Sequence, residues 1–156
     1  MKYEEALHYI HSFGRFPKKP SLERIRALCG RLGNPQERLR FIHVAGTNGK
    51  GSVSAMLASI LQEAGIRTGL FTSPFLEDFR ERFRVNGEMI PEEELAQAVA
   101  SLRPHAEALR QEGIILTEFD FVTALSFCWF LQKKCGIVVL EVGLGGRFDA
   151  TNVIPP

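Results

Sequence analysis

A glycine-rich segment with a single lysine contains the residue types that bind phosphate. The segment, "HVAGTNGKGS", covers residues 43–52 and lies between an apolar run and a helix-like stretch. Backbone N–H groups at a helix start have no helical partner, and glycine lets the backbone approach oxygen atoms closely. Lys50 can neutralise β- and γ-phosphates, and the hydroxyl of Thr47 or Ser52 can bind them. The plainer alternative is a glycine-rich turn with an exposed lysine.

The spacing within this segment differs from that of the common phosphate loop. In the common pattern a glycine stands six residues before the lysine, and Ser or Thr follows the lysine directly. Here Val44 occupies the early glycine position, and Gly51 separates Lys50 from Ser52. The flanking strand and helix still favour phosphate binding. The predicted nucleotide-binding residues are Gly46, Thr47, Asn48, Gly49, Lys50, Gly51 and Ser52.

Two further oxygen-bearing side chains follow predicted strands. Glu141 ends the apolar run that begins at Ile137, and an acid at a strand end beside a phosphate loop is a typical Mg²⁺ holder in nucleoside-triphosphate enzymes. The alternative for Glu141 is a carboxylate that is merely solvated. Ser73 follows the strand at 67–72, although a Ser-Pro pair on its own indicates only a turn.

Helices and strands alternate along the chain, which predicts an α/β fold with helices on both faces of a parallel sheet. In such sheets ligands bind at the carboxyl ends of the strands. Residues 39–72 predict strand, glycine loop, helix and parallel strand, with an amphipathic helix from Val53 to Ala64. Further helices are predicted at 3–13, 21–33, 91–113 and 117–134, and a central strand is predicted at 137–142. Ser21 is the expected N-cap of the second of these helices, and Pro104 is expected to kink or restart the third.

Composition limits the function classes. The chain has 156 residues, 45% hydrophobic and 24% charged, with a net charge of +1, so nucleic acid and acidic membranes have no bulk electrostatic attraction for it. The first residues lack the apolar core of a secretory signal, and the run at 121–131 is too short to span a bilayer. Cys29, Cys128 and Cys135 are expected to be reduced, packed thiols, and the protein to be cytoplasmic.

Other polar residues have plainer interpretations. Residues 75–86 predict a loop with one strand-like end, followed by a turn at Asn86-Gly87. Arg80, Arg82 and Arg84 alternate with apolar residues and predict a solvated face, with anion binding as the less favoured alternative. The acids of "TEFDF", which starts at Thr117, suit a helix N-terminus, and His43 suits packing better than catalysis.

Several long motifs in one order resemble the folylpolyglutamate synthase/dihydrofolate synthase family of Mur ligases. They are "HVAGTNGKGS", "TSPFL…ERFRVNG", "TEFDFVTALSF" and "LEVGLGGRFDATN". The resemblance implies a Mur-ligase type of phosphate-loop domain. It also implies a reaction in which ATP phosphorylates a carboxylate of dihydropteroate or a reduced folate, and the amine of L-glutamate then displaces the phosphate to form an amide.

The resemblance also implies roles for individual residues. Ser73 and Glu141 correspond to Mg²⁺ ligands of the family, and Lys50 to the catalytic lysine of the nucleotide loop, with ATP and Mg²⁺ as cofactors. The residues that match the pterin site are Thr117, Glu118, Phe119, Asp120, Phe148, Asp149 and Ala150, and residues 19–20 are expected to reach it. The implied partners are these small molecules, with no nucleic acid or membrane, and a monomer at full length.

Departures from the family pattern occur at single residues and in length. Phe75 stands where the family often has His, and Asp120 where it often has Glu. The family continues past the "DATN" motif with another metal-binding histidine, a carbamylated lysine and a C-terminal domain. Residues 1–156 are therefore expected to be an incomplete N-terminal ATP-binding domain that is inactive alone.

Two other functions stay open at this point. A different Mur-family amide ligase would act on a cell-wall precursor, although the "EVGLGGRFDATN" run argues against it. A nucleotide-binding module without ligase activity would share the phosphate loop and catalyse no amide formation.

Overall fold

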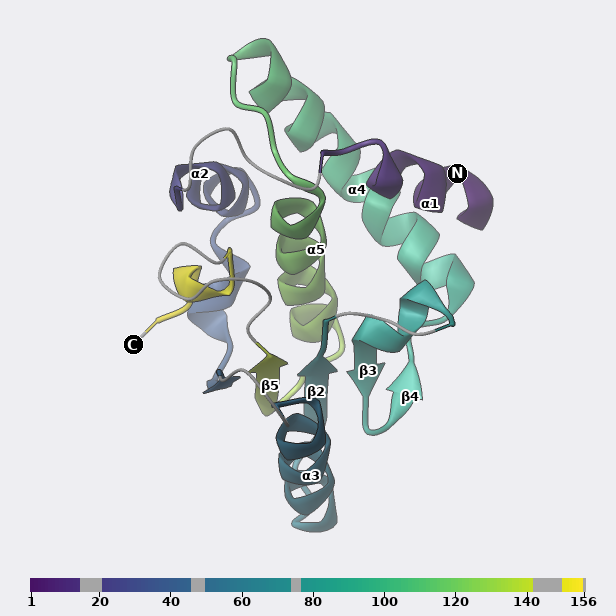
Figure 1. The fold of residues 1–156 in the computed structure, drawn as a ribbon, viewed down its shortest axis with the longest axis vertical. Coiled ribbons are helices and arrows are strands. Elements are labelled where there is room, and N and C mark those ends of the chain that lie inside the picture. Colours follow the sequence, from purple (N-terminus) through teal and green to yellow (C-terminus); the bar gives the residue numbers. More distant parts are fainter. Residues whose placement is uncertain (15–20, 46–49, 74–76, 142–149, 156) are drawn as a thin grey trace.

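The computed structural model describes residues 1–14, 21–45, 50–73, 77–141 and 150–155, with the backbone alone for Lys50. Figure 1 shows a sheet with a long helix, α3, below it and the remaining helices above and to one side. Short 3₁₀ turns lie at Pro35–Arg38, Phe79–Arg82 and Ala150–Val153. The helices are α1 Tyr3–His11, α2 Glu23–Arg31, α3 Lys50–Glu63, α4 Glu92–Gln111 and α5 Glu118–Gln132, and the strands are β1 Phe41–Val44, β2 Thr68–Phe71, β3 Phe83–Val85, β4 Glu88–Met89 and β5 Ile137–Glu141.

The sheet has the strand order β1-β5-β2-β3-β4. The β-branched run of β5 lies between β1 and β2 and pairs in parallel with both, as its apolar sequence predicts. β1 and β2 are thus parallel, as predicted, but β5 separates them. β3 and β4 extend the sheet in antiparallel orientation, so the parallel prediction holds for three of the five strands.

Helices cover both faces of the sheet. Along β5, Val138 and Leu140 belong to the main hydrophobic cluster, whereas Val139 is buried outside it, as expected when alternate side chains point to opposite faces. On the cluster side, the α5 ring of Phe127 lies 5.5 Å from the ring of Phe41. On the other side, α3 contacts β1, β2 and β5. The predicted α/β architecture with two covered faces is confirmed.

The apolar face of α3 differs from the predicted one. The helix forms where expected, but Val53, Met56 and Ile60 are 48%, 63% and 59% exposed, while Ser54 is fully buried. The more buried residues, Ser54, Leu57 and Leu61, recur at helical spacing and form a neighbouring stripe. A small side chain at the point of contact lets a helix approach a sheet closely, and this favours Ser54 over the larger apolar residues there.

Two helices begin or continue differently from their predictions. α2 begins one residue later than expected: Leu22 occupies the N-cap position without a side-chain cap, and Ser21 Oγ instead accepts from the backbone N–H of Glu23 at 3.0 Å. α4 runs without interruption across Pro104, so the helix does not restart there. Its packing against α1, α2 and α5 stabilises the helix beyond its local propensity.

The β3–β4 hairpin matches its turn signal. Asn86 and Gly87 have φ values of 49° and 83°, the left-handed pair that a two-residue hairpin requires. The Asn86 side chain accepts from the backbone N–H of Thr68 at 2.9 Å, and the Asn86 N–H donates to the Thr68 carbonyl at 2.9 Å. The hairpin is thereby fixed to the start of β2, and the 3₁₀ turn Phe79–Arg82 is held near the end of β2.

The remaining composition-based expectations concern membranes and thiols. Over the described residues, no helix has both the length and the apolar character needed to cross a membrane. All three cysteines are free, and Cys29 is buried, in agreement with a packing role.

Candidate functional site

The carboxyl ends of β1, β5 and β2 bring the predicted metal residues and the start of α3 to one edge of the sheet. Val44 of β1 lies in register with Glu141, the last residue of β5. Phe71, the last residue of β2, lies in register with Leu140, and Ser73 follows two residues later. The glycine loop connects β1 to α3; its residues Gly46, Thr47, Asn48 and Gly49 lie outside the described residues, and Lys50 is the first residue of α3.

The carboxylate of Glu141 is buried at the start of α3. Glu141 is 3% exposed, so its interpretation as a solvated strand end is wrong. A Cβ atom placed on Gly51 would lie 4.0 Å from Glu141 Oε2, which shows how closely the first turn of α3 approaches the carboxylate. Gly51 and Ser52 themselves are exposed. The positive end of the α3 dipole favours negative charge at this position.

The hydroxyl of Ser73 has a specific partner from the 3₁₀ turn before β3. Arg82 Nη2 donates to Ser73 Oγ at 3.2 Å, and Arg82 Nε donates to the carbonyl of Thr72 at 3.3 Å. One guanidinium therefore contacts two consecutive residues at the end of β2. Ser73 stays half-buried, so part of its surface remains open at the sheet edge.

Arg82 is buried, and the prediction of a solvated face for it is wrong. It is 6% exposed and lies over three phenylalanine rings, with centroid distances of 5.6 Å to Phe71, 5.5 Å to Phe79 and 5.7 Å to Phe119. Burial lowers the pKa of Arg82 to about 10, and the charges of Glu118 and Glu141 oppose this change.

The local backbone explains why alternation fails at Arg82. Within β3 the burial alternates around Arg84, whose side chain is half-buried and donates to the Gly87 carbonyl at 3.1 Å. Arg82 is the last residue of a 3₁₀ turn, so the period of two does not extend to it. Arg80 is half-buried and pairs with Asp78 at 2.8 Å. Of these three arginines, only Arg82 points its side chain toward the site.

The oxygen donors at this edge fit Mg²⁺. A serine hydroxyl and a carboxylate are hard ligands, and Mg²⁺ typically takes one or two protein oxygens and completes its octahedron with water and substrate phosphates. Among the residues that the structure describes, no group of three or more His, Cys, Asp or Glu side chains could hold a metal ion. The Ser73 hydroxyl and the Glu141 carboxylate would supply the one or two protein oxygens that a Mg²⁺ ion shared with a nucleotide takes.

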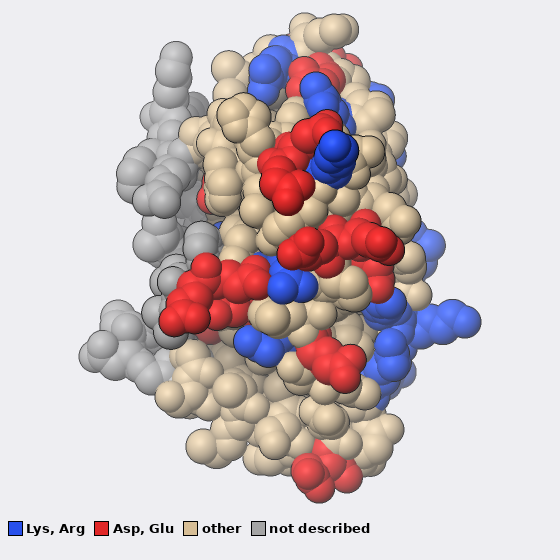
Figure 2. Space-filling model, turned by 90° about the vertical axis from the view of Figure 1, so that its right-hand side faces the viewer, with Lys and Arg blue, Asp and Glu red and all other residues tan. Residues whose placement is uncertain are grey.

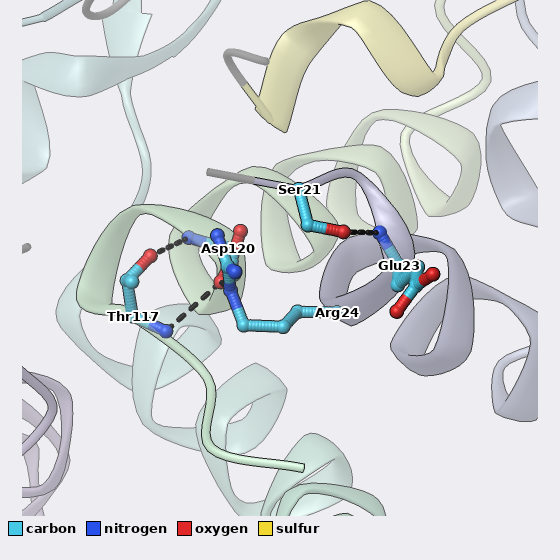
Figure 3. Close-up of polar contacts among 5 residues, drawn as sticks. All are labelled: Ser21, Glu23, Arg24, Thr117 and Asp120. Carbon is cyan, nitrogen blue, oxygen red and sulfur yellow. Dashed lines mark hydrogen bonds and ion pairs between the residues drawn. The ribbon is translucent and has the colours of Figure 1, made fainter. Parts of the chain in front are cut away.

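The start of α5 is held by a buried polar network (Figure 3). Thr117 Oγ1 accepts from the Asp120 N–H at 3.1 Å, and Asp120 Oδ2 accepts from the Thr117 N–H at 2.9 Å, which is a capping box. The same Asp120 oxygen pairs with Arg24 Nε of α2 at 2.8 Å. Asp120 is 2% exposed, so this side chain supports the predicted pterin segment from inside the protein.

Glu118 and Phe119 extend from this helix start toward the sheet edge. Glu118 Oε1 lies 2.7 Å from His11 Nδ1, and its charge also acts on Arg82. The Phe119 ring lies 5.9 Å from the Phe71 ring and contacts the guanidinium of Arg82. The segment predicted to line a pterin site thus lies against the same arginine that contacts Ser73.

The last predicted substrate residues are described only in part. Phe148 and Asp149 lie outside the described residues, as do Lys19 and Pro20. Ala150 is buried at the start of the last 3₁₀ turn. Next to it, Thr151 Oγ1 lies 2.8 Å from His43 Nε2, which supports a packing role for that histidine.

Sequence reasoning missed Arg24, His11 and Arg82 as neighbours of the predicted residues. Arg24 and His11 contact α5 from helices about a hundred residues away in sequence, at separations of 96 and 107 residues. No local pattern marks such contacts. For Arg82 the available signal was the dense aromatic content of 75–83, which supplies one of the three rings around it, Phe79.

A shallow pocket of about 460 Å³ lies elsewhere, between α1 and α4, and Glu5, His8, Tyr9 and Arg103 are among its lining residues. Arg103 lies 4.8 Å above the Tyr9 ring.

Figure 2 views the molecule from the side of α1 and α4, and acidic and basic side chains mix across this face. Such a mixture gives no single-sign surface for nucleic acid on this side.

Comparison with known proteins identifies close relatives. The chain is 46% identical to the folylpolyglutamate synthase of Lacticaseibacillus casei over 158 aligned residues, which is 100% of this chain and 37% of that protein. It is 48% identical to the dihydrofolate synthase/folylpolyglutamate synthase of Bacillus subtilis, over 99% of this chain and 36% of that protein. No family model matches the chain.

Solved structures agree with these sequences. The complex of a folylpolyglutamate synthase with AMPPCP and folate superimposes with a TM-score of 0.94 at 46% identity, over 100% of this chain and 38% of that one. The Thermotoga maritima folylpolyglutamate synthase gives 0.93 at 45% identity, over 99% of this chain and 36% of that one. This chain spans less than two fifths of either, yet its own length is matched throughout. Along its whole length it is similar to the N-terminal part of folylpolyglutamate synthases and dihydrofolate synthases.

Proposed function

We propose that the protein containing this chain is an ATP-dependent ligase that adds L-glutamate to dihydropteroate, to tetrahydrofolate polyglutamates, or to both, through an acyl-phosphate intermediate. The observation that carries the proposal is the meeting of the β1 end, the α3 start, Ser73 and Glu141 at one sheet edge beside the α5 start. The similarity to a folylpolyglutamate synthase solved with AMPPCP and folate supports a nucleotide and a folate as the two classes of substrate.

The glycine loop and Lys50 are assigned to ATP. The N–H groups at the start of α3 bind phosphate oxygens, and Lys50 acts as the catalytic lysine by neutralising charge on the transferred γ-phosphoryl group. The loop residues Gly46, Thr47, Asn48, Gly49, Gly51 and Ser52 complete the phosphate cradle. Little covalent chemistry is required of the protein in phosphoryl transfer, so the contribution of this loop is positioning and charge.

Ser73 and Glu141 are assigned to Mg²⁺. When bound, the ion supplies charge neutralisation for the transferred phosphoryl group. The Glu141 carboxylate is buried at this edge, and the Ser73 hydroxyl accepts a hydrogen bond from Arg82 Nη2 at 3.2 Å.

The α5 start is assigned to the pterin. Glu118 and Phe119 are half-buried and lie on the side of α5 that approaches the sheet edge, while Thr117 and Asp120 hold the helix start through the capping box. Phe148, Asp149 and Ala150 complete this assignment from the segment after β5. The amine of L-glutamate then attacks the acyl phosphate that forms on the bound substrate.

The proposal includes the setting of the reaction. The partners are the small molecules named above, the complete protein is a monomer in the cytoplasm, and it binds neither nucleic acid nor membrane. For the part of the protein given by these 156 residues, the small net charge of +1 supports the last two points, since it provides no bulk attraction for polyanions.

The test is product formation by the complete protein. ADP release should require L-glutamate together with dihydropteroate or a reduced folate, and UDP-muramoyl substrates should not replace them. Lys50→Ala should lower kcat by at least about 100-fold, by analogy with the loss of a single charge-stabilising group. Lys2→Ala, at an exposed position before α1, is the matched control and should leave kcat unchanged.

The two alternatives make different predictions in the same assay. A cell-wall ligase would release ADP with a UDP-muramoyl substrate and not with a pteroate. A nucleotide-binding module would bind ATP and release no substrate-dependent ADP with either. The specific observation that favours the folate reaction is the match to folylpolyglutamate synthases over the whole length of this chain.

A further inference from the structure

Arg82 occupies an unusual environment next to the sheet edge. Its guanidinium is almost completely buried, among the rings of Phe71, Phe79 and Phe119. Burying an arginine costs free energy unless its donors are used and its charge is balanced. The cost is offset here by two hydrogen bonds to the end of β2 and by the charges of nearby carboxylates.

The two hydrogen bonds of Arg82 define the position of Ser73. Nε donates to the Thr72 carbonyl at 3.3 Å and Nη2 donates to Ser73 Oγ at 3.2 Å. A planar guanidinium presents these two donors in a fixed geometry, so the side chain of Ser73 is oriented relative to the peptide group that joins Thr72 to Ser73. The bond from Arg82 occupies one acceptor site of the hydroxyl oxygen, and a second acceptor site remains.

The aromatic contacts of Arg82 join the metal side and the substrate side of the site. Phe71 ends β2, Phe79 lies in the 3₁₀ turn, and Phe119 belongs to the start of α5. The three rings limit the movement of the guanidinium, because displacing it would remove cation–π contacts as well as hydrogen bonds. The orientation of Ser73 is therefore set by groups from three elements.

We propose that Arg82 is a positioning residue that holds the Ser73 hydroxyl in the orientation needed to bind the divalent cation of the MgATP site. The proposal rests on the proposed function, specifically on Ser73 as a ligand of Mg²⁺. Outer partners of metal ligands commonly set ligand orientation, and their loss typically lowers metal affinity or activity by about 10- to 100-fold.

The test measures how strongly Mg²⁺ tightens the binding of AMPPCP to the complete protein. Calorimetry gives the AMPPCP Kd in saturating Mg²⁺ and in excess chelator. The ratio of the Kd in chelator to the Kd in Mg²⁺ reports metal binding at the site. Arg82→Lys keeps the positive charge but cannot reproduce the two-donor fork. It should reduce the ratio by about tenfold and leave the Kd in chelator unchanged.

The matched control is Arg84→Lys, two residues further along the chain. Arg84 is half-buried on β3 and donates to the Gly87 carbonyl in the hairpin. Its replacement should leave both Kd values unchanged. A loss in Arg84→Lys equal to that in Arg82→Lys would show a general effect of altering this hairpin and would overturn the proposal.

A second comparison separates positioning from a general structural effect. In a Ser73→Ala background the hydroxyl is absent, so adding Arg82→Lys should cause no further loss in the ratio. A further loss as large as in the wild-type background would overturn the proposal. Should Arg82→Lys fail to fold, Phe79→Leu loosens the aromatic contact from the side of the 3₁₀ turn and should show the same dependence on Ser73 with a smaller loss.

The outcomes also distinguish this proposal from the proposed function. If Ser73→Ala leaves the ratio unchanged, Ser73 does not bind the metal, and both the metal assignment and the role of Arg82 fail. If Ser73→Ala lowers the ratio and Arg82→Lys does not, the metal assignment stands and the role of Arg82 fails. A raised folate KM in Arg82→Lys with an unchanged ratio would assign Arg82 to substrate binding instead.

Discussion

Arg24 of α2 and Asp120 of α5 form an ion pair that is closed to solvent on the Asp120 side. The Nε–Oδ2 distance is 2.8 Å, and the side chains are 16% and 3% exposed. The same carboxylate oxygen accepts from the Thr117 N–H at 2.9 Å, so one atom connects α2 to the helix start that carries Glu118 and Phe119. Asp120 therefore determines where the predicted pterin segment lies.

Removing the Asp120 carboxylate should destabilise the protein strongly. Asp120→Ala leaves the guanidinium of Arg24 without its buried partner and removes half of the capping box, so the free energy of unfolding should fall by about 3 kcal/mol or more. Urea denaturation measures the change. The control is Arg110→Ala, which removes an exposed pair 3.9 Å from Glu107 and should cost less than about 0.5 kcal/mol. Equal losses in the two variants would contradict the buried role of Asp120.

The hydroxyl of Thr117 should contribute to stability through the cap. Thr117→Ala removes the acceptor for the Asp120 N–H and should lower the free energy of unfolding by about 1–2 kcal/mol. Thr117→Ser keeps the acceptor and should recover most of this loss. If the Ser variant is as unstable as the Ala variant, the stabilisation comes from the methyl group of Thr117 and not from the capping bond.

Gly69 should not tolerate a side chain, because β2 lies close to α5. A Cβ atom at Gly69 would lie 2.7 Å from Cδ1 of the fully buried Phe130 ring. Gly69→Ala should therefore lower the free energy of unfolding by about 1–3 kcal/mol. Gly30→Ala is the control: the added Cβ of this helical glycine meets nothing within 4 Å, so the variant should be neutral or stabilised.

A partner substitution tests the same contact from the other side. Phe130→Leu should cost stability in the wild-type background, because it leaves a cavity. Combined with Gly69→Ala, it should cost less than the sum of the two single changes, since the added methyl group and the smaller side chain compensate. Additive losses would contradict a direct contact between these residues.

Stability should fall in mildly alkaline solution because of the thiols. Burial raises the pKa of Cys29 to about 12 and of Cys128 and Cys135 to about 11, from an ordinary value of 9.0. Above pH 9.0 these thiols lose protons in the unfolded chain before they do so in the folded one. The unfolded state then binds fewer protons, and the free energy of unfolding decreases with pH up to the folded-state pKa values.

Urea denaturation between about pH 8 and pH 10 measures this slope. Burial also raises the pKa of Tyr9, which acts in the same direction at the alkaline end of the range. A variant with all three cysteines replaced by alanine is the control and should show a smaller slope. A wild-type stability that stays flat across the range would contradict buried, protonated thiols.

Much of the fold was predictable because local patterns decide it. The apolar run 137–141 identified the central strand, and the continuous apolar stretch after Thr117 identified the buried helix, since both patterns reflect burial on every side. The Asn86-Gly87 pair identified the turn, although not the strand that follows it, because few other residues adopt its backbone conformation. The edge position of Ser73 and Glu141 followed from parallel strand topology.

The features that the sequence did not predict depend on contacts between distant segments. Which face of α3 is buried depends on how closely the helix approaches the sheet, and this favours Ser54 over Val53 and Met56. Arg82 was predicted to be one of three solvated arginines, because the sequence shows only their alternation with apolar residues. It does not show the 3₁₀ turn or the packing of Arg82 among Phe71, Phe79 and Phe119. The pterin role of the α5 segment came from family resemblance and stays a prediction.

The most direct test of the proposed reaction follows an oxygen atom. The complete protein is incubated with ATP, L-glutamate and a pteroate or reduced folate whose reacting carboxylate is labelled with oxygen-18, and the released phosphate is analysed by mass spectrometry. If the carboxylate attacks the γ-phosphate of ATP, one labelled oxygen per turnover must appear in phosphate, and the new amide retains the other. Glutamate addition with unlabelled phosphate, or ADP release without amide formation, would contradict the acyl-phosphate ligase proposed for this protein.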